Sequence, residues 1–263
     1  MFSVTILGNN SAVPAYDRLP TSQLINMDRQ KFLIDCGEGT QMQLMRYKIK
    51  YSRISHIFIS HLHGDHYFGL IGLINSFGLL NRQQDLIIFG PPSLKKIIEF
   101  QLQVASTRLP FSLVFKEING PGLLLETDEI EISCFATDHR ITCYGFSFCE
   151  KIVTRKRLAL QGQPRRYAYC ADTRYNESLL DHISHYDLIY HEATYLDDQR
   201  EKAELRFHAT AKQAALLAKK AQVKRLLLGH FSSQYENLDG FKAEAQEIFS
   251  ATEIAEQGVT YLL

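Results

Sequence analysis

The run from His61 to His66, of sequence His-Leu-His-Gly-Asp-His, constrains the fold of this chain more than any other feature. It follows the apolar stretch Ile57-Phe58-Ile59, so four potential metal ligands lie where a buried strand ends and a loop begins. Alternate residues of an extended segment point to the same side, so the first two histidines can share one ion. The Asp-His pair after the glycine turn can face a second ion. The spacing therefore predicts a metal site at the end of a strand.

Composition excludes several classes of protein. The chain has 263 residues, of which 45% are hydrophobic and 22% charged, so disorder and fibrous repeats are excluded. The formal net charge is 0, so any nucleic acid would have to bind to a local basic patch. Neither an export signal nor an apolar run of membrane length is visible, and we expect a cytoplasmic protein with no membrane partner. An odd number of cysteines without a CxxC pair favours reduced thiols: Cys36, Cys134, Cys143, Cys149 and Cys170.

Strand patterns dominate both halves of the chain, with helical patterns between them, which predicts sheet-on-sheet layers covered by helices. A single domain over residues 1–263 is expected, with two similar halves that divide near 120–130. The predicted strands are 2–7, 23–27, 31–35, 55–60, 86–89, 113–117, 130–136, 144–149, 167–171, 187–190, 225–228 and 258–262. The predicted helices are 39–47, 66–80, 93–105, 209–222 and 239–250.

Three further potential ligands follow predicted strands. They are His139, Asp172 and His230, each directly after an apolar or aromatic segment. A sheet fixes the backbone at a strand end, where hydrogen bonds can then lock the side chain. Each of the three, taken alone, is best interpreted as structural. Their repeated placement, together with the early cluster, indicates a ligand set large enough for two adjacent ions.

The order of these ligands resembles the metallo-β-lactamase superfamily, and more specifically its ribonuclease Z family of tRNA 3′-processing endonucleases. This resemblance implies an α/β fold, a four-layer αββα sandwich with a dinuclear metal site at the sheet edge. The motifs that carry it lie between about residues 4 and 235: Gly8 to Pro14, Leu33 to Thr40, His61 to His66, Tyr169 to Arg174, His191 to Thr194, His208 to Ala211 and Gly229 to Ser232.

The resemblance assigns roles to these residues by position. It implies two Zn²⁺ ions per chain, although Mn²⁺ or Fe²⁺ could occupy the same ligands. A shared carboxylate would screen two neighbouring cations, and water between them would become the nucleophile. The implied ligands are His61, His63 and His139 on one ion, Asp65, His66 and His230 on the other, and Asp172 between them. The implied catalytic residues are Asp65, Glu192 and His208.

Several roles stay open. Asp65 is either a ligand only or also the group that orients and deprotonates the water. Asp35 either orients a zinc histidine or forms a turn. The role of His191 is not assigned. Three hydroxyls on loops expected near the metals could donate to a phosphate, namely Ser11, Thr194 and Ser232.

The chain departs from the ribonuclease Z pattern in two places. The family's long flexible arm, which grips tRNA, is replaced by a short basic hairpin over 150–166. In the loop after Val13 only Pro14 and Arg18 fit the family. The hairpin is either a solvated surface or a phosphate contact. The candidate RNA contacts are Arg18, Arg155, Lys156 and Arg157.

The leading hypothesis is a zinc-dependent endoribonuclease that cleaves precursor tRNA at the 3′ side of the acceptor stem, and the resemblance implies a homodimer. One alternative is a phosphodiesterase that acts on cyclic nucleotides or other small phosphodiesters. The other is a metal-stabilised RNA-binding module without catalytic activity.

Overall fold

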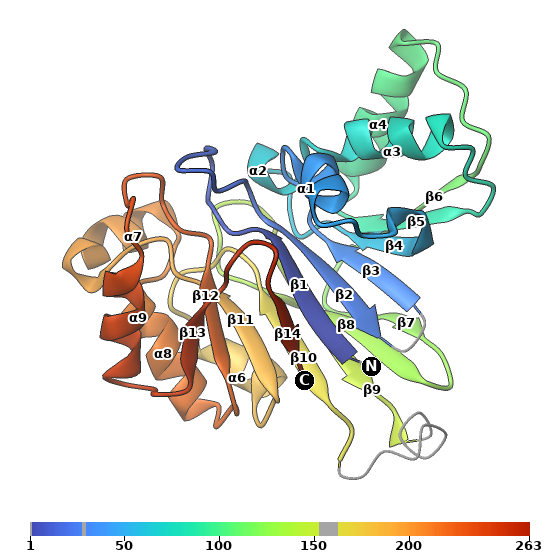
Figure 1. Ribbon diagram of the computed structural model, residues 1–263. Coiled ribbons are helices and arrows are strands. Elements are labelled where there is room, and N and C mark those ends of the chain that lie inside the picture. Colours follow the sequence, from blue (N-terminus) through green and yellow to red (C-terminus); the bar gives the residue numbers. More distant parts are fainter. Residues whose placement is uncertain (1, 28–29, 153–162) are drawn as a thin grey trace. The chain divides into compact units, whose positions relative to one another are not determined.

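The computed structural model describes residues 2–27, 30–152 and 163–263, which form two compact units. The first unit comprises Met1–Asn119 and Glu256–Leu262, and the second comprises Gly120–Ala255 with Leu263. Each unit contains one seven-stranded mixed sheet with helices that flank it (Figure 1).

The first sheet begins antiparallel and ends parallel. The C-terminal strand β14 pairs with β1, and the sheet is antiparallel as far as β3 and parallel from β3 to β6 (Figure 1). Parallel strands place their carboxyl ends at one edge, so the segments after β3 and β4 lie next to each other there. Its strand order is β14 (Thr260–Leu262), β1 (Phe2–Gly8), β2 (Ser22–Met27), β3 (Gln30–Ile34), β4 (Ile54–Phe58), β5 (Leu86–Gly90) and β6 (Leu113–Glu117).

The helices of the first unit are α1 (Thr40–Arg46), α2 (Gly64–Tyr67), α3 (Leu70–Leu79) and α4 (Ser93–Val104), with the 3₁₀ turn η1 (Tyr51–Arg53). Leucines and isoleucines at helical spacing bury one face of α3 in a core that also contains residues of β3, β4 and β5. The sequence predicted one helix over 66–80, but the structure has two. Gly69 separates them, and its N–H donates to the carbonyl of Cys36 at 2.9 Å.

The second sheet is also antiparallel in one part and parallel in the other. Strands β7 to β10 are antiparallel and β10 to β13 are parallel. The parallel strands again bring their carboxyl ends to one edge, where Asp172, Glu192 and His230 are found. Its strand order is β13 (Thr252–Ile254), β12 (Leu226–Gly229), β11 (Leu188–Glu192), β10 (Arg166–Cys170), β9 (Tyr144–Glu150), β8 (Ile130–Ala136) and β7 (Gly122–Glu126).

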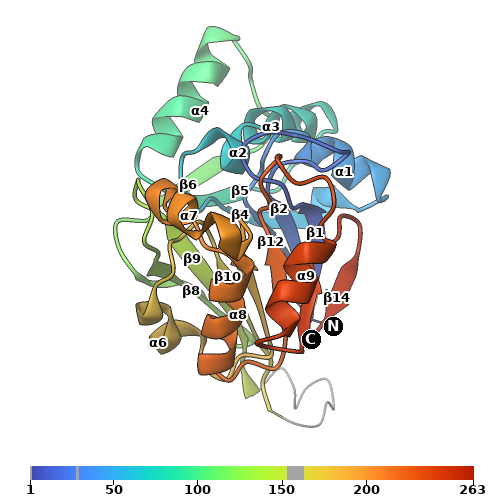
Figure 2. The ribbon, with the colours of Figure 1, turned by 90° about the vertical axis from the view of Figure 1, so that its left-hand side faces the viewer.

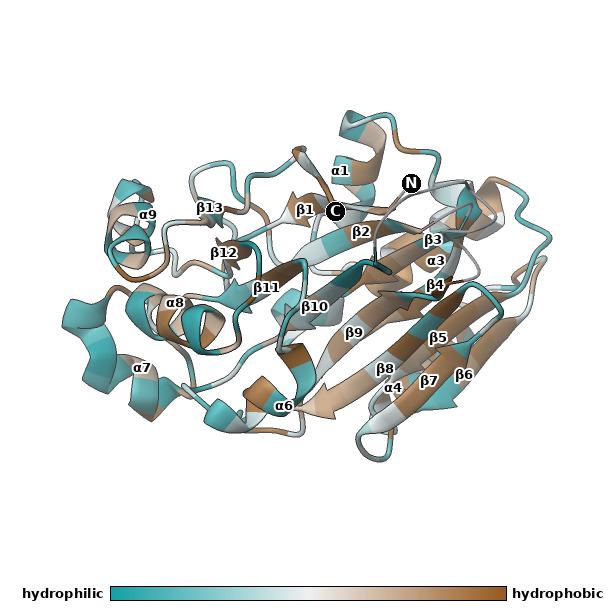
Figure 3. Ribbon diagram, turned by 90° about the horizontal axis from the view of Figure 1, so that it is seen from below, coloured by the Kyte–Doolittle hydropathy of each residue, from teal (hydrophilic) through white to brown (hydrophobic). Residues whose placement is uncertain are grey.

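The helices of this unit are α6 (Leu180–Ile183), α7 (Arg200–Arg206), α8 (Ala211–Lys220) and α9 (Asp239–Gln246), with 3₁₀ turns η2 (Glu177–Leu179) and η3 (Asp197–Gln199). Helix α8 begins with a capping box between Thr210 and Gln213, and its alanine-rich face packs into the core. Helices α8 and α9 lie side by side (Figure 2). Strand β12 is hydrophobic while α7 is largely hydrophilic (Figure 3).

All twelve predicted strands correspond to strands of the structure. Two were missed, β7 and the three-residue β13, as were the short helices α6 and α7. Strand β7 carries leucines instead of β-branched residues, and this weakens its strand signal. Within the described residues, no helix is long and apolar enough to cross a membrane.

Candidate metal centre

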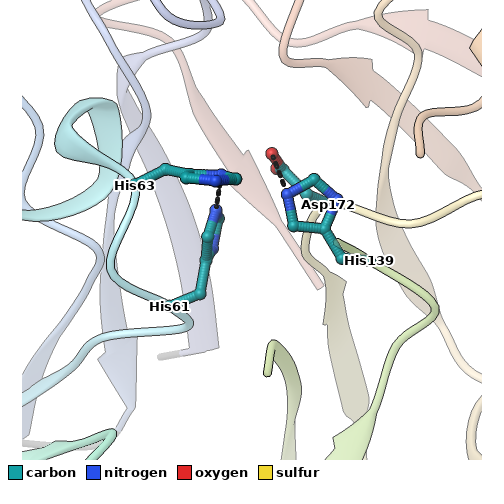
Figure 4. Close-up of side chains that lie close together, drawn as sticks. All are labelled: His61, His63, His139 and Asp172. Carbon is teal, nitrogen blue, oxygen red and sulfur yellow. Dashed lines mark hydrogen bonds and ion pairs between the residues drawn. The ribbon is translucent and has the colours of Figure 1, made fainter. Parts of the chain in front are cut away.

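The early histidines of the first unit point toward one another. His61 Nε2 lies 2.9 Å from His63 Nδ1, and the two rings meet nearly edge to face (Figure 4). His61 is completely buried and lies in the loop after β4. Two imidazole nitrogens that face each other at this distance can serve as ligands of one cation.

A buried carboxylate holds two of these histidines. Asp35 Oδ2 accepts a hydrogen bond from His66 Nδ1 at 2.8 Å and another from the Ser60 hydroxyl at 2.9 Å. The Ser60 oxygen in turn lies 3.0 Å from His61 Nδ1. Asp35 therefore fixes His66 directly and His61 through Ser60, and each imidazole is left with Nε2 to present to a cation. Asp35 adopts a left-handed backbone with φ 52°.

Asp65 is fixed from the loop after β1. The backbone N–H of Ala12 donates to Asp65 Oδ2 at 2.8 Å, and the same oxygen lies 3.4 Å from His66 Nε2. Asp65 lies in the first turn of the short helix α2, where a carboxylate is favoured by the helix dipole. The carboxylate of Asp65 and the imidazole of His66, which the resemblance assigns to one ion, thus lie close together.

In the second unit, Asp172 lies between two predicted histidine ligands. Its Oδ1 is 3.3 Å from His230 Nε2, and its Oδ2 is 3.8 Å from His139 Nε2 (Figure 4 shows the latter pair). Ligand atoms of Asp172, His208 and His230 all lie within 4.8 Å of one another. One carboxylate with a histidine on each oxygen is the arrangement expected of a bridging ligand.

Hydrogen bonds orient both of these histidines. His139 Nδ1 donates to the carbonyl of Phe207 at 3.0 Å, and His230 Nδ1 lies 2.9 Å from the Thr194 hydroxyl. Both contacts leave Nε2 as the ligand atom. Burial lowers the pKa of His139, although the Asp172 carboxylate opposes this, and the neutral imidazole is the form that binds metal. Phe207 and His230 both have left-handed backbones, with φ 61°.

Glu192 and His208 form a second ionisable pair in this unit. His208 Nδ1 lies 2.8 Å from Glu192 Oε1, which also accepts the Thr173 N–H at 3.1 Å. The other oxygen accepts the N–H and the hydroxyl of Thr194, at 3.0 and 2.8 Å. Burial would raise the pKa of Glu192, but the charge of His208 and its hydrogen bond outweigh burial and lower it. The carboxylate is therefore ionised and held in one orientation.

These donors fit zinc. Two ligand atoms about 2.0–2.1 Å from a tetrahedral zinc ion lie about 3.3 Å apart. The neighbouring ligand atoms are 2.9 Å apart in the His61–His63 pair and 3.4 Å apart in the Asp65–His66 pair. Those of Asp172 are 3.3 Å from His230 and 3.8 Å from His139. Imidazole nitrogen and carboxylate oxygen are also the donors expected at a catalytic zinc site.

Other candidates have more ordinary surroundings. Arg18, a candidate RNA contact, donates from Nε to Asn10 Oδ1 at 3.0 Å. The Ser11 carbonyl accepts the N–H of Val13, and the Ser232 N–H donates to the Thr194 carbonyl. His191 is buried, and its Nδ1 donates to the carbonyl of Glu192 at 2.6 Å. The candidates Arg155, Lys156 and Arg157 lie outside the described residues.

Sequence reasoning missed the groups that support these side chains. They are the Ser60 hydroxyl, the Ala12 and Thr173 N–H groups and the Phe207 carbonyl. Three of the four are backbone groups, for which a side-chain motif carries no signal. Ser60 directly precedes the metal run, and this adjacency was the one available indication.

Comparison with known proteins shows the family of this chain. Ribonuclease Z of Parabacteroides distasonis is 38% identical over an alignment of 297 positions that covers 98% of each chain. The family model described as "Anti-Pycsar protein Apyc1" matches residues 2–253. The chain belongs to the ribonuclease Z family and to the family described by the Apyc1 model. It is therefore a metal-dependent hydrolase, as predicted.

Solved structures confirm the fold class. The chain superposes on human tRNase Z, short form, with a TM-score of 0.84 and 31% identity, over 99% of this chain and 98% of that one. The metallo-β-lactamase fold protein YhfI from Bacillus subtilis gives a TM-score of 0.78 at 23% identity, with complete coverage of both chains. The predicted α/β class and metallo-β-lactamase fold are thus confirmed.

Proposed function

We propose that this protein is a zinc-dependent endoribonuclease that cleaves precursor tRNA at the 3′ side of the acceptor stem. Relatives named ribonuclease Z and the likeness to human tRNase Z support the substrate. The single observation that carries the catalytic role is the 2.8 Å contact between His208 Nδ1 and Glu192 Oε1. His208 is outside the proposed ligand set, so orientation of a metal ligand does not account for the buried carboxylate that faces its imidazole.

We infer that these ligand groups hold two zinc ions. When bound, zinc would supply an activated water near neutral pH and stabilise charge on the phosphoryl oxygens. The proposed ligands are His61, His63 and His139 on one ion, Asp65, His66 and His230 on the other, and Asp172 bridging.

Asp65 has a second role in this proposal. The Ala12 N–H holds its Oδ2, so the orientation of the carboxylate is set by the backbone. We assign to Asp65 the orientation of the water and acceptance of its proton. The Asp65→Ala variant should lose cleavage; retention of full cleavage would instead favour a metal-stabilised RNA-binding module.

His208 would complete the reaction as the general acid. Its Nδ1 is engaged by Glu192, so Nε2 is the atom that can donate a proton to the leaving ribose 3′-oxygen. Thr173 and Thr194 hold the Glu192 carboxylate at both oxygens. The carboxylate in turn stabilises the charged form of the imidazole.

A phosphodiesterase of small diesters is the second candidate. The connection from β9 to β10 comprises only residues 151–165, too few for the long arm of the tRNA-processing family. The Parabacteroides alignment is 297 positions long, so that relative carries residues that this 263-residue chain lacks. A shorter substrate-gripping element fits either an armless tRNA processor or an enzyme for small substrates.

One experiment separates the two. The zinc-loaded protein is offered precursor tRNA, a 3′,5′-cyclic nucleotide and a small chromogenic diester in parallel. We expect tRNA cleavage, reduced by alanine at Arg155, Lys156 and Arg157, with unchanged hydrolysis of the chromogenic diester. Efficient cyclic nucleotide hydrolysis without tRNA cleavage would contradict the proposal. The matched control replaces three exposed lysines of the second unit, namely Lys219, Lys224 and Lys242.

We further propose a homodimer. Apolar side chains on the first unit are unusually exposed: Met42 and Met45 of α1 are 69% and 59% exposed, and Leu79 of α3 is 88% exposed. Exposed apolar patches mark association surfaces. Light scattering of the protein as it elutes from a size-exclusion column gives its mass and tests this. The double variant Met42→Lys, Leu79→Lys should shift a dimer toward the monomer.

A further inference from the structure

A basic cavity lies in the first unit, away from its metal ligands. Its volume is about 390 Å³, and it is lined by residues of β1 to β3, β14, the end of α1 and η1. Four of its lining residues are cationic, namely Lys31, Lys48, Lys50 and Arg53. The remaining lining residues are neutral, so the wall has no carboxylate.

The positive charges of this cavity are not compensated within the described part of the chain. There, no carboxylate lies within ion-pair distance of any of the four cations. Lys31 donates instead to a neutral acceptor, Asn26 Oδ1, at 2.8 Å. Burial, and then repulsion by Arg53, lowers the pKa of Lys31. A bound anion would relieve this repulsion.

Lys48 occupies a position that normally favours glycine. It follows Tyr47, the C-cap residue of α1, with φ 53°, and its N–H donates to the Met45 carbonyl at 3.0 Å. The next N–H, of Ile49, donates to the Leu44 carbonyl at 2.9 Å, which completes a Schellman-type helix end. A lysine here strains the backbone, so the charged side chain is present despite a conformational cost.

The cavity and the metal ligands lie at opposite ends of the same strands. Lys31 is at the start of β3 and Arg53 directly precedes β4, whereas Asp35 and His61 follow the other ends of these strands. Five residues of strand span about 16 Å. A small molecule in the cavity would therefore not contact the metal ligands of this unit.

We propose that this cavity binds a small phosphorylated anion with at least two negative charges, such as a free nucleotide, and that it does so through the phosphate groups. Its volume is within the range of small-molecule sites, and lysine with arginine is the usual donor set for phosphate. A concave wall with apolar Leu24 and Ile49 among the cations favours a compact organic phosphate over a long polymer. The proposal is independent of the substrate cleaved at the metal centre.

Equilibrium dialysis of the zinc-loaded protein with labelled ADP at low salt tests the proposal. We expect Lys50→Ala to weaken ADP binding about threefold and Lys48→Gly with Lys50→Ala about tenfold. Glycine at 48 relieves the left-handed backbone, so this variant should not lose stability. The control, Lys95→Ala with Lys96→Ala on α4, should bind ADP like the parent.

Hydrolysis and binding measurements on these variants decide the outcome. Hydrolysis of a chromogenic diester should be unchanged in the double variant, because none of its positions is assigned to the metal centre. Equal loss of ADP binding in the control pair, or unchanged binding in the double variant, would overturn the proposal. It would also be overturned if the double variant lost affinity for a single-stranded RNA but not for ADP.

Discussion

Asp35 Oδ2 and His66 Nδ1 are 2.8 Å apart, and both side chains are fully buried. A charge-assisted hydrogen bond in this setting fixes both the ring orientation and the tautomer of the histidine. The same carboxylate reaches His61 through Ser60. One aspartate thus orients two histidines that the proposed mechanism places on different ions.

Asp35→Asn should therefore weaken metal binding about 10- to 100-fold. Asparagine tolerates the left-handed backbone at this position, so the change removes charge without new backbone strain. Competition with a chelating dye gives the affinity. Asp128→Asn, in an exposed turn, is the control, and equal affinities in the two variants would disprove the assigned role of Asp35.

Glu192→Gln should lower the turnover rate about 100-fold while zinc content stays at the parental level. The amide cannot stabilise the charged His208 imidazole as the carboxylate does. His208→Ala should cause a similar loss, and the double variant should lose little more, because the two residues act as a unit. Glu204→Gln, which changes an exposed glutamate, is the control. Additive losses would indicate separate roles.

Stability should depend on pH through His56. Burial, assisted by Arg82, lowers the pKa of His56 from 6.5 to about 4. Between these values the unfolded chain binds more protons, so stability is full above pH 6.5 and falls as pH decreases toward 4. The loss should be on the order of 2–3 kcal/mol. Urea unfolding of the chelated protein at several pH values measures it.

The variant His56→Phe isolates this effect. Phenylalanine keeps a ring beside Phe58 and Phe89, both of which stack on His56. Other groups titrate equally in parent and variant, so the difference between their pH profiles reports His56. Profiles that run parallel from pH 7.5 to 4.5 would refute the prediction.

Gly69→Ala should destabilise the protein by about 2 kcal/mol. A Cβ at this position would lie 2.2 Å from the Gly37 carbonyl oxygen, where the loop after Asp35 meets the start of α3. Gly72→Ala, one turn later in α3, meets only the flexible Gln41 side chain at 3.4 Å and should stabilise the helix by about 0.5–1 kcal/mol. Thermal unfolding compares the pair, and a stable Gly69→Ala protein would contradict the close packing.

The sequence was most informative where chemistry and periodicity coincide. The seven proposed metal ligands were predicted because they follow apolar strands, and in the structure each lies after a strand of its own unit, with Asp65 and His66 in the short helix α2. Asp35 was recognised as either an orienting residue or a turn, and its bond to His66 now favours the former.

Other features leave no trace in sequence pattern. The break between α2 and α3 depends on the approach of Gly69 to the Cys36–Gly37 backbone, a contact across more than thirty residues. The carbonyl that holds His139 belongs to Phe207, which has no distinguishing side-chain chemistry for that task. Such partners depend on tertiary position and become visible only in the folded chain.

Asp35, Phe207 and His230 have left-handed backbones. L-residues are disfavoured in this region, whereas glycine enters it freely. Glycine would relieve the backbone at these positions, but at His230 it would also remove a buried imidazole that hydrogen-bonds Thr194 and leave a cavity, so the strained residue is tied to the packing of the site.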